Sequence, residues 1–205
     1  MKHLEPYQMD ILKEMINIGV GRAAGILNEM TKFRVLLQVP FIKVLSPLHL
    51  KKELKELGRH MVAAVRLGFK GPFSGRAALV FPPDSASKLV SVLTGEEPGT
   101  PELDSVRAGT LEEVGNIVLN GVMGSIGNIL KQHIKYSLPT YTEDTLDKLI
   151  SLDIIDPPPN TILLVHIRFT IQQLQIEGDI ILLFEVGSFT ALLKLIENVR
   201  VNDQE

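Results

Sequence analysis

Apolar residues recur every three or four positions along two long stretches of the chain, 9–30 and about 104–132. This spacing places the apolar side chains on one face of a helix, so it predicts an amphipathic helix in each stretch. Pro6 fits a first helical turn before the first stretch. The first stripe consists of Met9, Leu12, Ile16, Val20, Ala23, Leu27 and Met30, and the second of Leu111, Val114, Val118, Val122, Ile126 and Ile129.

Shorter runs rich in β-branched and aromatic residues follow each helix and are bounded by turn residues, which is typical of strands. The predicted strands are 34–44, 62–67 and 76–81 in the first half and 135–141, 161–171 and 175–184 in the second. In each half the last two strands read as a hairpin. A closing helix is expected at 84–93, capped by Asp84 or Ser85, and another at 188–199, capped by Ser188. A small extra helix is expected at 48–59.

The second half of the chain repeats the first. With an offset of 99, seven residues coincide with identical residues: Leu12, Glu14, Asn17, Ile18, Gly25, Lys32 and Pro40 fall on Leu111, Glu113, Asn116, Ile117, Gly124, Lys131 and Pro139. With an offset of 103, Gly75, Leu79, Phe81, Ser85 and Leu89 fall on Gly178, Leu182, Phe184, Ser188 and Leu192. The four-residue difference is expected in the proline-rich segment 156–160. Chance rarely supplies Glu, Asn, Gly and Pro in one register, so the chain is a duplication.

The expected fold class is α+β. A lone helix with three strands has little core, and the linker at 94–101 is short, so we expect the halves to share one sheet. The sequence thus predicts one domain over 1–205, with pseudo-repeats at about 1–98 and 103–201. That domain would have pseudo-two-fold symmetry, a shared mixed β-sheet and long helices.

Composition narrows the function classes. The chain has 205 residues, 45% of them hydrophobic and 22% charged, which is ordinary for a globular protein. Its net charge of −3 argues against a general nucleic-acid binder, and the absence of cysteine excludes thiolate metal sites and cysteine nucleophiles. No apolar run reaches the roughly 18 residues of a spanning helix, and the first residues lack a signal core. We expect a soluble cytoplasmic protein without membrane insertion.

Several catalytic motifs can be set aside. Gly19-Val-Gly21 resembles the start of a dinucleotide loop, but it lies inside a helical pattern with no strand before it, which favours close helix packing. The five histidines are scattered without metal-ligand spacing. No nucleophile elbow supports Ser-His-Asp catalysis.

Two pairs of residues remain, Glu14 with Asn17 and Glu113 with Asn116. Their i, i+3 spacing puts both members of each pair on one helical face. Asn favours caps and turns, so twin asparagines within helices need a reason. One alternative is a solvated face with no further role. Another, for the second pair alone, is a capping box over 110–113 that would occupy Glu113.

The spacing Asp10-x3-Glu14-x2-Asn17-x22-Pro40 resembles in full the signature of the CheC/CheX/FliY phosphatases of chemotaxis. The second copy is similar except at Gly109, where the family has Asp or Ser. Two copies across nearly the whole chain resemble CheC more than single-site CheX. Gly also weakens a helix interior by about 1 kcal/mol relative to Ala, so the helix could fray just before Glu113.

The resemblance implies hydrolysis of the aspartyl phosphate of a phosphorylated CheY-like response regulator. Asn17 and Asn116 would orient the attacking water, because a carboxamide can accept from water and donate without pKa tuning. Glu14 and Glu113 would pair with a lysine of the partner. No cofactor of its own is implied, since Mg²⁺ would belong to the regulator. The receptor deamidase CheD is a further partner that the resemblance suggests, and internal symmetry favours a monomer.

Two other classes stay open. A non-catalytic adaptor or flagellar-switch-like module would keep the exposed helices without using the asparagines for chemistry. A small-molecule enzyme would need a deep pocket with convergent polar groups, which the sequence does not indicate. Pro40 and Pro139 are assigned to strand geometry.

Overall fold

A computed structural model describes residues 5–57, 60–97, 99–149, 162–185 and 194–195. The first half contains α1 (Pro6–Thr31), β1 (Leu36–Leu45), α2 (Pro47–Leu57), β2 (Met61–Lys70), β3 (Gly75–Phe81) and α3 (Pro83–Thr94). The second half contains α4 (Pro101–Ile129), β4 (Lys135–Tyr136), β5 (Thr140–Thr145), α5 (Leu146–Leu149), β6 (Ile162–Ile171) and β7 (Ile176–Glu185). The predicted helix at 188–199 lies outside the described residues except for 194–195.

One seven-stranded sheet joins the two halves, in the order β1-β6-β7-β3-β2, with β4 and β5 both paired to the far side of β2. The duplicated α+β fold and its shared sheet are therefore confirmed. The prediction of a mixed sheet is wrong, because every strand pair is antiparallel. Each half supplies an antiparallel hairpin, and a two-fold axis between β3 and β7 reverses the direction of the second hairpin relative to the first.

The outer strands are exchanged between the halves. Among the described strands, β1 of the first half pairs with β6 of the second and no other, and β5 of the second half pairs with β2 of the first. Each hairpin is thus completed by a strand from the other repeat. Neither repeat could form this arrangement alone, and the halves form a single domain.

The strand registers locate the extra residues of the second half. With the predicted offset of 103, Ala78 of β3 pairs with its own equivalent in β7, Ile181. Phe69 faces Gly75 across the first hairpin, and Phe169 faces Gly178 across the second, so β6 follows β2 at an offset of 100. Three of the four extra residues therefore lie in the hairpin connection at Gln172–Leu174, a 3-10 turn. The prediction that all four precede β6 is wrong, because apolar patterns identify strands but do not count the residues in a turn.

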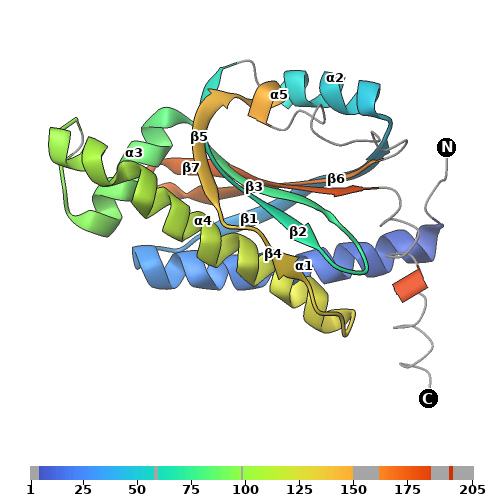
Figure 1. The fold of residues 1–205 in the computed structure, drawn as a ribbon. Coiled ribbons are helices and arrows are strands. Elements are labelled where there is room, and N and C mark those ends of the chain that lie inside the picture. Colours follow the sequence, from blue (N-terminus) through green and yellow to red (C-terminus); the bar gives the residue numbers. More distant parts are fainter. Residues whose placement is uncertain (1–4, 58–59, 98, 150–161, 186–193, 196–205) are drawn as a thin grey trace.

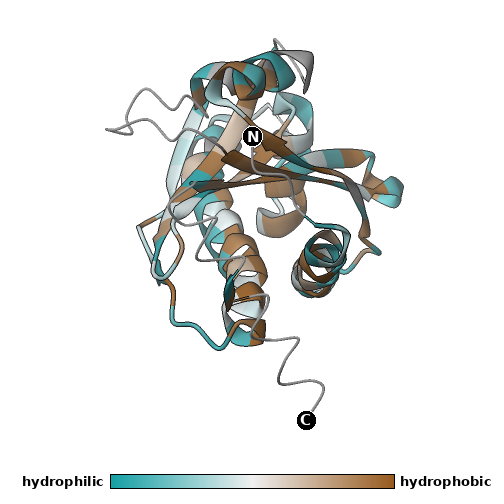
Figure 2. Cartoon of the chain, turned by 90° about the vertical axis from the view of Figure 1, so that its right-hand side faces the viewer, coloured by the Kyte–Doolittle hydropathy of each residue, from teal (hydrophilic) through white to brown (hydrophobic). Residues whose placement is uncertain are grey.

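The helices form two layers on either side of the sheet. The long helices α1 and α4 lie side by side on one face, with α3 packed against α4, and the short helices α2 and α5 lie on the other face (Figure 1). Figure 2 shows that the strands between these layers are mostly hydrophobic. The larger core lies between the sheet and α1/α4, and a smaller one lies beneath α2 and α5.

Both predicted apolar stripes face the larger core. Leu12, Ile16 and Leu27 of α1 are fully buried, as are Leu111 and Val122 of α4. The two helices approach closely at Gly19, where an added Cβ would lie 3.1 Å from the carbonyl oxygen of Val122. Close helix packing at this glycine is confirmed.

Some element boundaries differ from the predictions. The predicted strand 135–141 is interrupted at 137–139, where Pro139 has no N–H to donate and Ser137 donates its own to Gly68 O over 2.9 Å. Helix α3 has Pro82 at its N-cap. Ser85, a predicted cap, is buried and its hydroxyl instead accepts from the backbone N–H of Glu177. Pro40 lies where the register of edge strand β1 shifts, as its missing N–H allows.

The ends of α1 and α4 explain one pair of matched residues. Lys32 and Lys131 both have a positive φ, of 62° and 53°, in the left-handed region that stops a helix. The Lys32 N–H donates to Asn28 O over 2.8 Å. These twin lysines are thus equivalent helix-terminating residues.

A glycine opposite an aromatic ring is required in each hairpin. An added Cβ at Gly75 would lie 2.5 Å from Cζ of Phe69 and would also overlap Leu183 O. We predict that Gly75→Ala lowers the free energy of unfolding by about 1–3 kcal/mol, as overpacking does in other cores. Chemical denaturation measures this. The control Gly109→Ala, in open space within α4, should raise stability by about 0.5–1 kcal/mol, and equal effects of the two substitutions would contradict the steric explanation.

Candidate functional site

The first candidate pair lies on the solvent face of α1. Glu14 and Asn17 are exposed, while Met15 and Ile16 between them are buried against the sheet. The start of the helix is fixed by a capping box in which Gln8 accepts from the backbone N–H of Glu5 over 3.0 Å. Because the buried stripe fixes the rotation of α1, the exposed pair has a defined outward direction.

The second candidate pair lies on the corresponding face of α4. Glu113 is exposed and Asn116 is half-buried. Because α4 begins at Pro101, Thr110 is in the interior of the helix, and the alternative of a capping box over 110–113 is wrong. The expected fraying at Gly109 is also absent, since the helix continues through this residue.

The two asparagines have different surroundings. Nδ2 of Asn120 donates to Oδ1 of Asn116 over 2.7 Å, and Oδ1 of Asn120 is buried without a partner. The residue equivalent to Asn120 in the first copy is Gly21, which has no side chain to offer. The acceptor oxygen of Asn116 is therefore already engaged. The sequence analysis missed Asn120, although its spacing of four from Asn116 could have indicated the contact.

An exposed isoleucine follows each asparagine. Ile18 is 48% exposed and Ile117 is 37% exposed. In the sequence, Ile18 and Ile117 stand out only as a match between the repeats. Single exposed apolar residues are common, but the same one beside both candidate pairs is a repeated feature of this surface.

Contacts with β5 hold the N-terminal part of α4. Glu112 accepts from the backbone N–H of Tyr141 over 2.9 Å, and Arg107 forms an ion pair with Glu143 at 3.2 Å. Burial raises the pKa of the Tyr141 hydroxyl, and the hydrogen bond to Glu143 raises it further, so this hydroxyl keeps its proton and donates. These contacts fix the part of α4 that runs from Arg107 to the residue directly before Glu113.

The site has the character of an open surface. The structure brings Glu14 together with Asn17 and Glu113 together with Asn116, on separate helices. In the described ranges there is no group of three or more acidic or histidine side chains that could hold a metal ion. None of the helices searched, all within the described part of the chain, is long and apolar enough to cross a bilayer. An exposed helix face suits a macromolecular partner better than a small substrate.

Known proteins resemble this chain in both sequence and fold. Residues 63–149, which include the second candidate pair, match the family described as chemotaxis phosphatase CheX. The CheY-P phosphatase CheC of Bacillus subtilis is 28% identical over 153 residues, covering 70% of each chain.

Two solved structures show the same fold at low identity. FliY of Thermotoga maritima has a TM-score of 0.75 at 15% identity, covering 97% of this chain and 100% of that one. The FliM middle domain from H. pylori has a TM-score of 0.61 at 11% identity, covering 94% and 99%. The likeness extends over both repeats. Together these comparisons show that the chain is similar in sequence to chemotaxis phosphatases of the CheX and CheC type and that it shares the fold of FliY.

Proposed function

We propose that this protein is a CheY-P phosphatase that removes the phosphoryl group from the aspartate of a CheY-like response regulator. The observation that carries the proposal is the presence of two Glu/Asn pairs on the outer faces of two helices, where the surface of a partner protein can reach them. The relative from Bacillus subtilis is named for this activity, and the CheX family for a chemotaxis phosphatase.

Asn17 supplies the positioning that the reaction needs. The oxygen of water attacks phosphorus, the bond from phosphorus to the aspartyl carboxylate oxygen breaks, and inorganic phosphate leaves as the carboxylate is regenerated. The Asn17 side chain accepts a hydrogen bond from the water through its C=O and donates through its NH₂. Holding the water in line is the main task, since little covalent chemistry falls to the protein.

Glu14 and Glu113 orient the regulator. Each carboxylate lies about one helical turn before its asparagine, so a lysine near the phosphoryl group could pair with Glu while the phosphorus faces Asn. Such a charged contact on an exposed surface contributes more to the orientation and rate of encounter than to affinity. The resemblance also implies that any Mg²⁺ in this reaction is held by the regulator, and it suggests a CheD-type partner. The monomeric state stays a prediction from the internal symmetry, and the cytoplasmic location one from the sequence.

The first site is the stronger of the two. Asn17 has Gly21 beside it and a free acceptor, whereas Asn116 already accepts from Asn120. A water molecule at the second site must compete with this hydrogen bond. In addition, the position equivalent to Asp10 is Gly109 in the second copy, so the second site has no carboxylate at this position.

A non-catalytic adaptor is the second candidate. The FliM middle domain has the same fold, which leaves open a module that binds the regulator without hydrolysing its phosphate. An adaptor would bind the phosphorylated regulator without shortening its lifetime.

Replacing both asparagines should abolish the activity. Decay of a phosphorylated CheY-type regulator from the same organism should slow by roughly 10- to 100-fold with Asn17→Ala plus Asn116→Ala, because water loses its orientation. Asn17→Ala alone should remove most of the acceleration. Asn128→Ala, an exposed asparagine near the end of α4, is the matched control and should leave the rate unchanged. Binding without any acceleration by wild type would favour the adaptor.

Removing the competing amide should improve the second site. In the Asn17→Ala background, Asn120→Gly should raise the decay rate about 2- to 10-fold, the range that one neutral hydrogen bond supplies. The reciprocal change, Gly21→Asn in the Asn116→Ala background, should lower the rate by a similar factor. Gly21 has open space around it, so the new side chain fits. An unchanged rate in both backgrounds would show that this hydrogen bond does not limit the second site.

Ile18 should contribute to docking. Ile18→Ser should raise KM for the phosphorylated regulator several-fold with little change in kcat, because the apolar contact is made in the bound complex before and during reaction. Leu48→Ser on α2, on the opposite face of the sheet and 78% exposed, is the control. A fall in kcat at constant KM would place Ile18 in the positioning of water and not in docking.

A further inference from the structure

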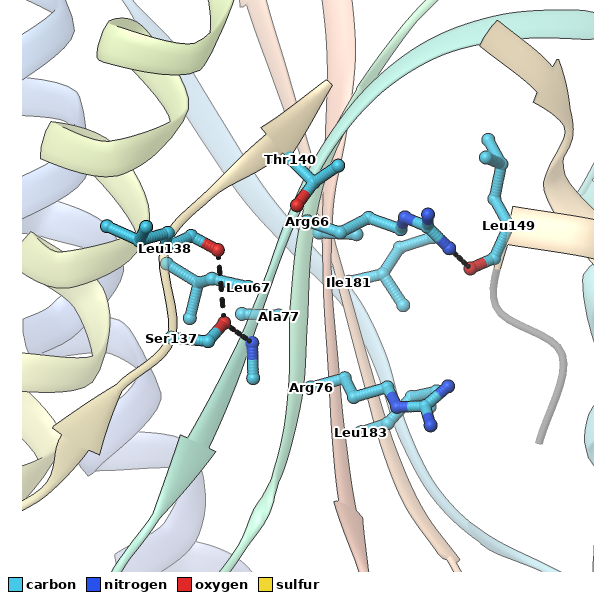
Figure 3. A pocket seen from close by; sticks show the side chains of 12 residues that line it. Arg66, Leu67, Arg76, Ala77, Ser137, Leu138, Thr140, Leu149, Ile181 and Leu183 are labelled. Atoms are coloured by element: carbon cyan, nitrogen blue, oxygen red, sulfur yellow. Dashed lines mark hydrogen bonds between the residues drawn. The ribbon is translucent and has the colours of Figure 1, made fainter. Parts of the chain in front are cut away.

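A cavity of about 200 Å³ lies on the sheet over β2, β3 and β7 (Figure 3). Its polar lining residues are Arg66 of β2, Arg76 of β3, and Ser137 and Thr140 on either side of the β4–β5 break. Leu138, Leu149, Ile181 and Leu183 provide apolar walls. No Asp or Glu is among the described residues that line the cavity. None of the four candidate site residues borders it either.

Both arginine side chains extend from the sheet toward the side on which α5 lies (Figure 3). Nη1 of Arg66 donates to Leu149 O over 2.7 Å, and its Nη2 lies 3.4 Å from the hydroxyl of Thr142. Its Nε is buried without a partner. Both partners of this guanidinium are neutral, so the described residues leave its positive charge without an opposite charge. Arg76 has a polar contact of its own.

Because of the internal two-fold symmetry, the cavity can be compared with the equivalent place on the sheet around His166. Arg66 pairs with Thr140 on one side and with Ala78 on the other. At the equivalent place in the second half, His166 pairs with Phe41 and with Ile181. One row further along, Gly68 pairs with Arg76 in the first half, and Arg168 pairs with Asp179 in the second.

In the second half this place is filled and its charges are paired. Nε2 of His166 lies 2.6 Å from Oδ1 of Asp179, and Nε of Arg168 lies 3.3 Å from the same oxygen. The ring of Phe41 covers His166 at a centroid distance of 5.1 Å. A carboxylate therefore sits between two nitrogen donors, beneath an aromatic ring.

The place around Arg66 differs from the place around His166 at every one of these positions. Thr140 stands where Phe41 stands beside His166, Gly68 stands at the position of Arg168, and Ala78 stands at the position of Ile181. Each of these residues is smaller than its counterpart. Arg76 replaces Asp179, which exchanges the carboxylate for a second cation. The same sheet position thus carries two guanidinium groups beside an open cavity, where the other half carries an internal carboxylate.

We propose that this cavity binds an oxyanion, a carboxylate or phosphate group carried on a small apolar body. The guanidinium of Arg66 is the fixed positive partner, since Leu149 and Thr142 hold its orientation, and planar guanidinium groups match the geometry of carboxylate and phosphate. Ile181, Leu183 and the 87% exposed Leu138 contact the apolar part. The ligand takes the place that the Asp179 carboxylate has in the second half.

The oxyanion could come from a free small molecule or from an acidic side chain of a partner protein. Titrations of the full chain, followed by backbone amide NMR shifts, distinguish these sources with three probes: sodium phosphate, sodium butyrate and the capped dipeptide acetyl-Glu-Leu-amide. Saturable shifts at β2 and β3 are expected. Tighter binding of the dipeptide than of butyrate indicates a partner's side chain, and the reverse order a free anion.

Two variants test the cavity itself, independently of phosphatase activity. Arg76→Asp restores the carboxylate of the second half, and Ala78→Ile fills the cavity without a change of charge, so each should weaken binding at least ten-fold. Arg168→Gln removes an arginine from the corresponding place in the second half and should leave binding unchanged. Absence of saturable shifts with all three probes would overturn the proposal. Saturation that survives both cavity variants would also overturn it, because the anion would then be bound elsewhere.

Discussion

The exchange of edge strands is the constraint on which the rest of this structure depends. β1 completes the hairpin of the second repeat and β5 completes that of the first, so hydrogen bonds of each repeat are satisfied only by the other. The β3–β7 pair then closes the centre of the sheet. Because this sheet is continuous, α1 and α4 lie on one face of it, with Glu14, Asn17 and Glu113 exposed to solvent and Asn116 half-buried. The geometry of both sites follows from strand pairing that involves neither site.

Because of the duplication, most positions of one repeat have an equivalent in the other. The equivalent residues differ at positions where core packing does not determine which residue is present. Gly21 and Asn120 are equivalent, yet only the latter bonds to its neighbouring asparagine. On the far face of the sheet, His166 with Asp179 and Arg66 with Arg76 are equivalent pairs of opposite electrostatic character. Equivalent backbone therefore supports two unequal helix surfaces and two unequal sheet surfaces in one chain.

The sequence predicted the parts of the fold that depend on periodicity. The stripes through Leu12 and Leu111 located both long helices, and β-branched runs located the hairpins. It did not predict which strands pair across repeats, because period-two patterns specify a buried face but not a neighbour. The sequence also predicted that Glu14 and Asn17 lie on one face of a helix. It did not predict the hydrogen bond of Asn120 to Asn116, because that bond depends on a side-chain rotamer. The fraying expected at Gly109 is absent, since packing of the apolar stripe outweighs the local cost of glycine in the helix.

The pairing of β1 also bears on how the chain is made. Its strand partner in the described part of the chain, β6, begins at Ile162, more than a hundred residues later in the sequence. While the ribosome is still producing the second repeat, the ten residues of β1 have no hydrogen-bonding neighbour, although the β2–β3 hairpin is already complete. An apolar strand in that state is a site of intermolecular association. Pro40, which cannot donate a backbone hydrogen bond, lies at the register shift of β1 and interrupts the ladder that such association would need.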